Sequence, residues 1–365
     1  MRLLFITNLP SPYRVDFFNE LGKKCELTVC FERINAVDRD LLWKANSVNR
    51  FNEIYADVKP IFNDKSVGFG IVKVIKNTSF DKLIISGYAS PSVILAIIYC
   101  KIKKIKYYIE GDGGFNHNDL FLKYLAKKCL LRGAQGYFTT CEEYINYLTK
   151  NGINRDLIIK YPFSSIKNKD ILEKPVALEE KLELKKMLGI KEKKIILSVG
   201  QYIYRKGFDI LLDATNLLPK EIGVYIVGGK PTKELISLRE KFNLTNVYFI
   251  DFKEKKELKK WYMAADIFVF PTREDVWGLV INEAMACGLP IITTDRCIAG
   301  LEMIDSKFIV PTNNSYELAK MINMVICNQI LRQKMAEDNI KKIKDYTIEK
   351  MCDVHMKELE REISV

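Results

Sequence analysis

Short apolar runs rich in β-branched residues alternate along this chain with longer segments of helical periodicity. The alternation predicts βαβ units and mostly parallel sheets, because parallel strands need a crossover connection between them. We expect an α/β protein with two doubly wound sheets. The predicted strands are 3–7, 26–31, 82–86, 106–110 and 136–140 in the first half, and 194–200, 224–229, 247–252, 267–272 and 290–295 in the second.

The length of 365 residues exceeds the size at which one hydrophobic core usually stops growing. A lysine-rich connector with Ser164, Ser165 and Pro175 separates the two sets of strands. We therefore expect two Rossmann-like domains, 1–168 and 169–345, that face each other across a cleft. Residues 346–365 have apolar positions at helical spacing and predict an amphipathic helix that packs back toward the N-terminal domain.

The nine cysteines are an odd number, are scattered and form no Cys-x-x-Cys pair, and the chain has only two histidines. This pattern favours reduced thiols in the cytoplasm and argues against a protein metal site or a disulfide framework. We expect no metal and no cofactor. The longest strongly apolar run, 92–100, is about half of the roughly 20 residues that cross a bilayer, so no spanning helix is expected.

The formal net charge is +11, and most of the surplus falls within residues 1–165. Such a surplus indicates an anionic partner. The segment 121–132 carries an apolar stripe flanked by lysines, which is typical of a helix that docks on an anionic membrane and equally of an ordinary packed surface helix. No module that interleaves aromatic and basic residues is present, so nucleic acid is not an expected partner.

Two acidic residues stand eight positions apart in the segment REDVWGLVINEAMACGLP (273–290). Asp275 falls on a predicted loop and Glu283 about one turn into a helix that Gly288 ends. Between them, the helix start offers the backbone N–H groups of residues 278–280 to a phosphate. A carboxylate can accept from both hydroxyls of a vicinal diol, so the pattern fits a nucleotide-sugar. The alternative is that Asp275 caps the helix and Glu283 forms a surface ion pair.

A second strand-turn-helix segment, SVGQYIYRKGFDILLDA (198–214), places Arg205 and Lys206 directly before Gly207. Cations at this position can meet a diphosphate held by the other helix start. The combination of the two segments indicates a donor site that binds a diphosphate and two hydroxylated rings.

These two segments, together with VYIVGG (224–229) and TNLPSPYRVDFFNEL (7–21), resemble the retaining glycosyltransferases of family 4, which have the GT-B fold. The likeness is specific mainly over 194–304 and is greatest to members that build bacterial capsular and other surface polysaccharides. By this resemblance Asp275, or Glu274 one residue earlier, contacts the donor sugar, Glu283 the ribose and Lys206 the diphosphate. Many members carry an arginine where this chain has Gln201, and Arg205 then supplies that charge.

The resemblance also implies a set of donor-side and acceptor-side contacts. The further donor-binding candidates are Gly200, Gln201, Gly207, Trp277, Gly278, Leu279 and Val280. The candidates on the acceptor or sugar side are Pro12, Tyr13, Arg14, Glu110 and Asp112.

The function that the resemblance implies is transfer of a sugar from a nucleotide-diphosphate sugar to a growing, lipid-diphosphate-linked saccharide, with retention at the anomeric carbon. The domain 1–168 then serves the acceptor and 169–345 the donor, in the cytoplasm or at the inner face of the cell membrane. A nucleotide-sugar epimerase of the same architecture is the alternative. An oxidoreductase is disfavoured because no G-x-G-x-x-G follows a predicted strand.

Overall fold

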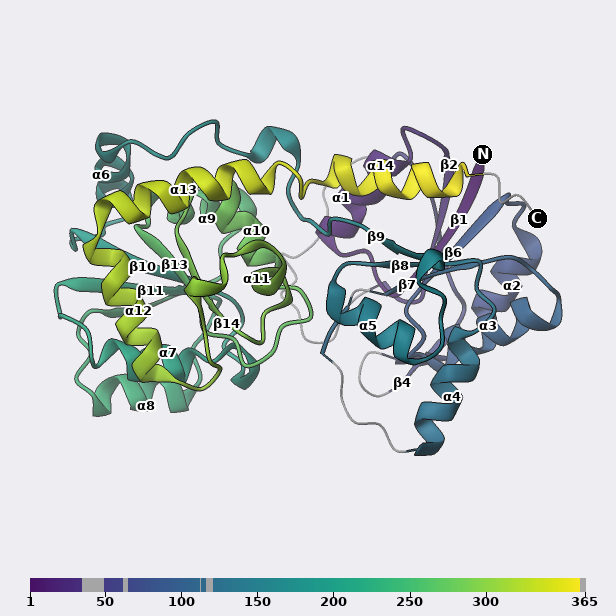
Figure 1. Ribbon diagram of the computed structural model, residues 1–365, viewed down its shortest axis with the longest axis horizontal. Helices are drawn as coiled ribbons and strands as arrows, with labels where there is room; N and C mark the ends of the chain where they lie inside the picture. The colour runs from purple at the N-terminus through teal and green to yellow at the C-terminus, as the bar shows by residue number, and fades with distance from the viewer. Residues whose placement is uncertain (35–48, 62–64, 112, 116–120, 362–365) are drawn as a thin grey trace. The chain divides into compact units, whose positions relative to one another are not determined.

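The computed structural model describes residues 1–34, 49–61, 65–111, 113–115 and 121–361 (Figure 1). It divides into two compact units. The N-terminal unit comprises Met1–Ser165 and Ile348–Val365, and the C-terminal unit comprises Ile166–Thr347. In the described part of the chain, no helix is both long enough and apolar enough to cross a bilayer.

The N-terminal unit is built on a seven-stranded parallel sheet with the strand order β3-β2-β1-β6-β7-β8-β9. Its central strands are buried on both faces, because helices cover the sheet on either side (Figure 1). The strands are β1 (Arg2–Thr7), β2 (Glu26–Phe31), β3 (Asn52–Tyr55), β6 (Lys82–Ser86), β7 (Tyr108–Gly111), β8 (Gly136–Thr139) and β9 (Ile158–Lys160), with a separate hairpin of β4 (Lys59–Ile61) and β5 (Lys65–Val67).

The helices of this unit come from both ends of the chain. They are α1 (Pro12–Leu21), α2 (Gly70–Asn77), α3 (Pro91–Ile102), α4 (Phe121–Leu131), α5 (Glu142–Lys150) and α14 (Ile348–Leu359), with the 3-10 turn η1 (Arg155–Leu157). Helix α14 lies against α1. Its buried side chains, among them Met351, Cys352, His355 and Met356, recur at the three- and four-residue spacing that places them on one helical face.

The C-terminal unit contains a six-stranded parallel sheet with the order β12-β11-β10-β13-β14-β15. The strands are β10 (Lys194–Val199), β11 (Ile222–Val227), β12 (Val247–Ile250), β13 (Ile267–Phe270), β14 (Ile291–Thr294) and β15 (Ile309–Val310). The helices are α6 (Leu178–Met187), α7 (Phe208–Thr215), α8 (Lys233–Lys241), α9 (Lys255–Ala264), α10 (Leu279–Ala286), α11 (Ile298–Met303), α12 (Ser315–Cys327) and α13 (Gln329–Ile343), with the 3-10 turns η2 (Asn168–Asp170), η3 (Tyr204–Lys206) and η4 (Ser306–Phe308).

Both sheets have short strands joined through helices, so the predicted α/β class with two doubly wound sheets is confirmed. In the C-terminal sheet the order reverses direction between β10 and β13, since β11 and β12 lie on one side of β10 and β13 to β15 on the other. Ligands in open α/β sheets bind at the carboxyl ends of the strands next to such a switch point. The loops after β10 and β13 are therefore the place to look for a site in this unit.

Candidate active site

The loops after β10 and β13 touch because the two strands are neighbours. The N–H of Arg273 donates to the carbonyl oxygen of Arg205 at 2.7 Å. Gly207 permits this approach: its φ is 67°, and a Cβ there would lie 2.1 Å from the carbonyl oxygen of Pro271. Any side chain at position 207 would push the two loops apart.

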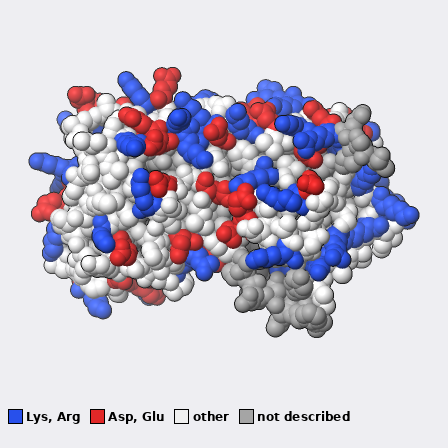
Figure 2. Space-filling model, in the orientation of Figure 1, with Lys and Arg blue, Asp and Glu red and all other residues white. Residues whose placement is uncertain are grey.

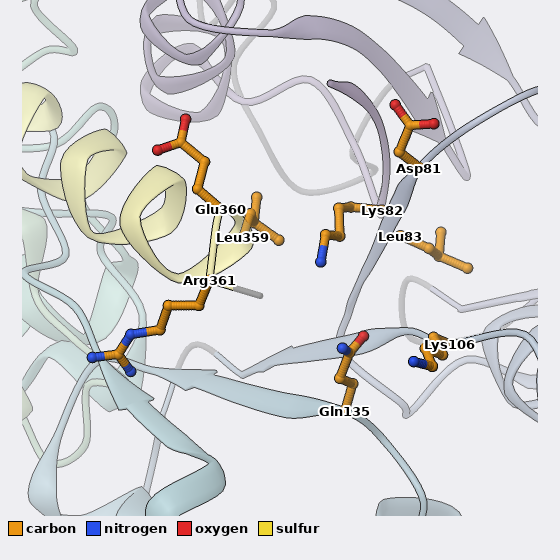
Figure 3. A pocket seen from close by; sticks show the side chains of 8 residues that line it. All are labelled: Asp81, Lys82, Leu83, Lys106, Gln135, Leu359, Glu360 and Arg361. Carbon is orange, nitrogen blue, oxygen red and sulfur yellow. The ribbon is translucent and has the colours of Figure 1, made fainter. Parts of the chain in front are cut away.

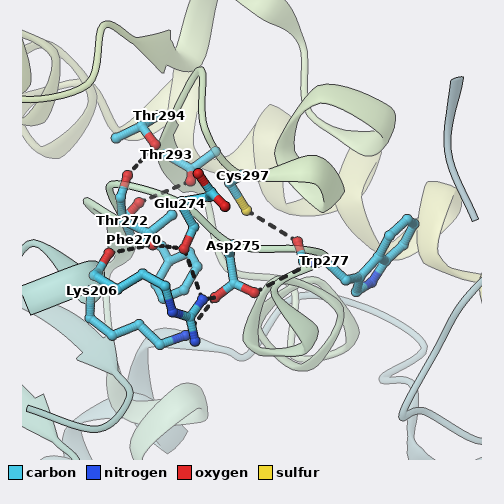
Figure 4. A network of polar contacts seen from close by, with 10 residues as sticks. Lys206, Phe270, Thr272, Glu274, Asp275, Trp277, Thr293, Thr294 and Cys297 are labelled. Atoms are coloured by element: carbon cyan, nitrogen blue, oxygen red, sulfur yellow. Dashed lines mark hydrogen bonds and ion pairs between the residues drawn. The ribbon is translucent and has the colours of Figure 1, made fainter. Parts of the chain in front are cut away.

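The two predicted cations converge on the first predicted acid (Figure 4). Lys206 Nζ lies 2.5 Å from Asp275 Oδ2, and Arg205 Nη1 lies 3.3 Å from the same oxygen. Arg205 also donates to the carbonyl oxygen of Glu274 at 2.8 Å. The carboxylate that meets both cations is thus that of Asp275, while Glu274 contributes its backbone. The Lys206 ammonium also lies 4.9 Å from the centre of the Phe270 ring, a cation–π distance.

The loop after β13 packs closely against Cys297 where it enters α10. Gly278 has a φ of 98°, and a Cβ there would lie 2.9 Å from Cys297 Sγ. The Cys297 thiol donates to the carbonyl oxygen of Trp277, and burial raises the pKa of this thiol to about 12, so it stays protonated. The first turn beyond Gly278 carries Leu279 and Val280, whose N–H groups an α-helix leaves without intrahelical partners.

Trp277 is a packing residue. Its side chain is buried, and its Nε1 donates to Asn282 Oδ1 at 2.7 Å. Figure 4 shows the ring pointing away from Asp275. The indole thus packs in the interior of the unit, and a donor contact of Trp277 stays a prediction.

Glu283 lies in the second turn of α10 and is held by a residue of α9. The Tyr262 hydroxyl donates to Glu283 Oε2 at 2.9 Å. Burial, together with the neighbouring carboxylate, raises the pKa of Tyr262 well above its usual range, so the hydroxyl remains a donor. This hydrogen bond restricts the orientation of the Glu283 carboxylate.

Gly200 and Gln201 directly follow β10. The N–H of Gly200 donates to the carbonyl oxygen of Val227 at 2.9 Å, and Gln201 is exposed. A Cβ on Gly228 would lie 1.8 Å from the Gly200 carbonyl oxygen, so the backbone after β10 runs very close to the backbone after β11. These residues lie on the same loop as Arg205 and Lys206.

On the N-terminal unit, two of the predicted acceptor contacts are interior groups. Arg14 Nη1 donates to Glu110 Oε1 at 2.9 Å and Nη2 lies 2.8 Å from Oε2, and the two side chains are 3% and 0% exposed. In this structure burial and mutual pairing leave Arg14 and Glu110 facing each other, and their place on the acceptor or sugar side stays a prediction. Pro12 opens α1, and the Tyr13 ring packs edge-on against Phe163. Asp112 lies outside the described residues.

A surface cavity of about 380 Å³ is present elsewhere on the N-terminal unit (Figure 3). Its lining residues are Asp81, Lys82, Leu83, Lys106, Gln135, Leu359, Glu360 and Arg361. Most of them stand at or before the first residues of β6, β7 and β8, and the last three stand at the end of α14. The cavity thus lies at the amino ends of the strands, opposite the edge where such sheets bind ligands.

Sequence reasoning missed two residues that shape the site. Arg273 begins the acidic segment 273–290, but the sequence around it does not indicate the partners of its side chain. Tyr262 reads as a core residue because it lies in an apolar helix face, and only its contact with Glu283 shows a further role. Among the described residues, no group of three or more His, Cys, Asp or Glu side chains is arranged to hold a metal ion.

Comparison with known proteins gives a consistent result. Residues 180–342 match the family model described as "Glycosyl transferases group 1". The chain is 23% identical over 282 residues to the N,N'-diacetylbacillosaminyl-diphospho-undecaprenol alpha-1,3-N-acetylgalactosaminyltransferase of Campylobacter jejuni, an alignment that covers 74% of each protein. It is 28% identical over 159 residues to the lipopolysaccharide glucosyltransferase WaaG of Escherichia coli, covering 42% of this chain and 40% of WaaG.

A solved structure extends the likeness to nearly the whole chain. Anabaena HepE in complex with UDP superposes with a TM-score of 0.79 and 17% identity, covering 98% of this chain and 99% of that one. At this identity the likeness establishes the shared fold and no more.

Proposed function

Because this chain is a glycosyltransferase of the GT-B fold, related through residues 180–342 to the group 1 family, we propose that it is a retaining transferase of family 4. Its proposed donor is a nucleotide-diphosphate sugar. Its proposed acceptor is a growing bacterial surface saccharide, such as a capsular one, carried on a lipid diphosphate. The name of the Campylobacter relative supports the acceptor, since it describes transfer onto a sugar on diphospho-undecaprenol. The solved UDP complex of HepE supports the donor.

The observation that carries this proposal is the convergence of Arg205 and Lys206 on Asp275 beside the first turn of α10. At about 4 Å and an effective dielectric near 20, one cation–phosphate pair is worth on the order of 4 kcal/mol before desolvation. A diphosphate bound here competes with Asp275 for both cations. The displaced carboxylate is then able to accept hydrogen bonds from the hydroxyls of the donor sugar.

In the proposed reaction the bond between the anomeric carbon and the phosphate oxygen breaks, and its electron pair stays on the diphosphate. Lys206, Arg205 and the N–H groups of residues 278–280 stabilise the negative charge that develops there. The acceptor hydroxyl attacks from the same face, and its proton passes to an oxygen of the departing phosphate. This route needs neither a protein base nor a metal ion.

Glu283 is the proposed ribose ligand. Its carboxylate is already oriented by Tyr262, and a carboxylate accepts from two adjacent hydroxyls better than a neutral amide does. Gly200, Gln201 and Gly207 are proposed to let the loop after β10 approach the donor closely.

Replacement of Lys206 by alanine tests the diphosphate assignment. We expect turnover to fall by roughly 10²–10³-fold, as loss of one preorganised donor does. Steady-state transfer assays measure this, after a thermal-shift panel of nucleoside diphosphates and nucleotide-sugars has identified the donor. Lys307→Ala is the matched control, because Lys307 is an exposed lysine of the same unit that pairs with Asp305. Near-normal turnover of Lys206→Ala would contradict the proposed role, and loss of activity in EDTA would contradict the metal-independent route.

The relatives named above are transferases, which disfavours the epimerase alternative. Product analysis with the donor alone checks this, since an epimerase needs no acceptor.

The α3–α4 face of the N-terminal unit is proposed to rest on the anionic cytoplasmic leaflet, where a lipid-linked acceptor lies. Ile98, Ile102 and Leu125 are exposed on it, and the neighbouring cations are Lys103, Lys104, Lys106, Lys127, Lys128 and Arg132. Figure 2 shows Lys and Arg side chains spread over this region. Exposed apolar side chains with cations close by in the sequence are typical of helices that make peripheral membrane contact.

Flotation with vesicles that contain an anionic lipid tests this surface. We expect the protein to float with them at low salt, and Ile102→Ser with Lys103→Glu to reduce the bound fraction. A protein that stays at the bottom of the gradient with both anionic and neutral vesicles would exclude the membrane role.

A further inference from the structure

Arg273 lies three residues after β13, and its guanidinium group donates hydrogen bonds to three different segments. Nη1 donates to the carbonyl oxygen of Tyr204 at 2.8 Å and to Asp209 Oδ1 at 2.8 Å, and Nη2 donates to Asp209 Oδ2 at 2.6 Å. Nε donates to Asn313 Oδ1 at 2.8 Å. Only 12% of the side chain is exposed. The contacts join the loop after β13 to η3, to the first turn of α7 and to the loop after β15.

Arg273 also contacts η3 in two further ways, through the aromatic ring of Tyr204 and through its own backbone N–H. The guanidinium carbon lies 3.9 Å from the centre of the Tyr204 ring. The Arg273 N–H and the Thr272 hydroxyl both donate to the carbonyl oxygen of Arg205, at 2.7 Å and 2.9 Å. Two successive carbonyl groups of η3 are therefore bound by residues 272 and 273. Since η3 carries Arg205 and Lys206, these contacts fix the place from which both cations extend.

Arg273 could instead be read as a third phosphate-binding cation, given its place next to the acidic pair. The contacts disfavour that reading. Four of its five N–H groups already have partners, and the two nitrogens that would grip a phosphate face the Asp209 carboxylate in a bidentate pair. Its charge is neutralised within the unit, while Arg205 is 44% exposed.

We infer that Arg273 is a positioning residue: together with Asp209 it clamps η3 so that Arg205 and Lys206 meet the diphosphate of the donor. The inference rests on the proposed function, because it assigns the clamp to the diphosphate part of that site. Geometry supports it independently, since the clamp joins the two loops that bring the cations and Asp275 together. A lysine cannot replace this arginine, because an ammonium does not reproduce the planar bidentate fork.

Calorimetry with UDP, UMP and inorganic pyrophosphate tests the inference. The relevant quantity is the ratio of UDP to UMP affinity, which reports the second phosphate. We expect Arg273→Ala to lower UDP affinity by about 10–100-fold while UMP affinity changes by less than about 3-fold, because charged hydrogen bonds to the second phosphate lose their alignment. Pyrophosphate affinity should fall with UDP affinity, whatever base the protein prefers.

Two further variants test whether Arg273 acts by positioning η3 or by its own positive charge. Arg273→Lys keeps the charge but loses the fork, and Asp209→Asn leaves the arginine in place but weakens its anchor, so both should show the same selective loss. In a double-mutant cycle, Arg273→Ala should add little to Lys206→Ala, because both act on one interaction. A third phosphate-binding cation would give the opposite pattern, with activity retained in Arg273→Lys and additive effects in the cycle.

Arg332→Ala is the control for general destabilisation. Arg332 belongs to the same unit and also donates to backbone carbonyls, those of Val325 and Ile326. These lie at the far end of α12, a helix of 13 residues and thus about 20 Å long. We expect this variant to lose stability but keep the UDP to UMP ratio. Hydrogen exchange provides a ligand-free readout: amides of 203–207 should exchange faster in Arg273→Ala and not in Arg332→Ala.

The outcomes distinguish the two proposals. If the wild-type protein binds UDP and pyrophosphate no better than UMP and phosphate, the proposed diphosphate site fails and the inference fails with it. If the wild type shows the preference and Arg273→Ala, Arg273→Lys and Asp209→Asn all retain it, only the clamp is refuted. Unchanged exchange at 203–207 in a folded Arg273→Ala protein would likewise refute the clamp.

Discussion

Replacing Glu110 by glutamine should strongly destabilise the N-terminal unit. Glu110 on β7 is fully buried and meets side chains of α1, of α14 and of the residue after β9. Arg14 of α1 binds both of its oxygens, the Tyr161 hydroxyl donates to Oε1 at 3.0 Å, and His355 Nε2 of α14 lies 3.5 Å from Oε1. The amide would keep one acceptor but would turn an NH2 group toward the buried guanidinium.

The expected loss in the free energy of unfolding follows from the buried Arg14 charge that the substitution leaves without its partner. Breaking a buried ion pair typically costs 3–5 kcal/mol because the other charge is left without compensation. Glutamine retains one hydrogen-bond acceptor, so we expect a loss of about 3 kcal/mol in the free energy of unfolding. For a domain of this size, that corresponds to a fall in Tm of roughly 6–12 °C.

Urea and thermal unfolding of the full chain measure the effect, with Glu142→Gln as the matched control. Glu142 undergoes the same chemical change in the same unit, but its partners Lys160 and Arg155 form an exposed network. Surface pairs of this kind contribute at most about 1 kcal/mol. If Glu110→Gln destabilised the protein no more than Glu142→Gln does, the buried pair would not be the anchor that its geometry implies.

The effect should also depend on pH. Burial by itself raises the pKa of Glu110, but the charge of Arg14, its hydrogen bond and the neighbouring His355 outweigh burial and hold the pKa well below its ordinary value of 4.5. A carboxyl group whose pKa is lower in the folded state stabilises the fold above the unfolded pKa and loses that contribution as the pH falls. The stability gap between the wild type and Glu110→Gln should be full at pH 7 and should shrink below about pH 4.5.

Three further changes address the C-terminal unit. Gly207→Ala should disrupt transfer and lower Tm, because φ is 67° and the new Cβ would meet the Pro271 carbonyl at 2.1 Å; circular dichroism and activity assays check both. Tyr262→Phe removes the donor to Glu283, so KM for the nucleotide-sugar should rise about 10-fold with kcat little changed in steady-state assays. Glu283→Gln should weaken nucleotide binding in calorimetry, and an unchanged affinity would remove its ribose assignment.

Most strands of both sheets could be predicted from the sequence, but the edge strands β3, β9 and β15 could not. β1, β2, β6 and β10 are continuous apolar runs that only a covered parallel sheet explains. β3 carries polar residues at its start, and β9 and β15 have only three and two residues, so all three depend on pairing with the neighbouring strand. The fourth edge strand, β12, is a run of four apolar residues and is predicted.

The contacts of the charged residues could also be predicted only in part from the sequence. The sequence predicts that Arg205 and Lys206 meet a diphosphate at the neighbouring helix start, and the structure shows both cations against Asp275 of the adjacent loop. Glu110 lies on β7 and Arg14 in the first turn of α1, and the two side chains pair inside the unit. Sequence position identifies which edge a residue reaches but not whether the side chain turns outward or inward, since that choice depends on packing from distant elements such as α14.

The location of α14 has a consequence for how the protein is made. The helix that brings His355 to Glu110 and covers α1 follows the whole C-terminal unit in the sequence, although it belongs to the N-terminal one. A ribosome releases the chain from its N-terminus, and domains that are complete in sequence fold as they emerge. Here the N-terminal unit cannot complete its packing until translation has passed residue 359, because α1 and Glu110 lack their contacts with α14 before that point. The second unit is therefore the first that can reach its final state.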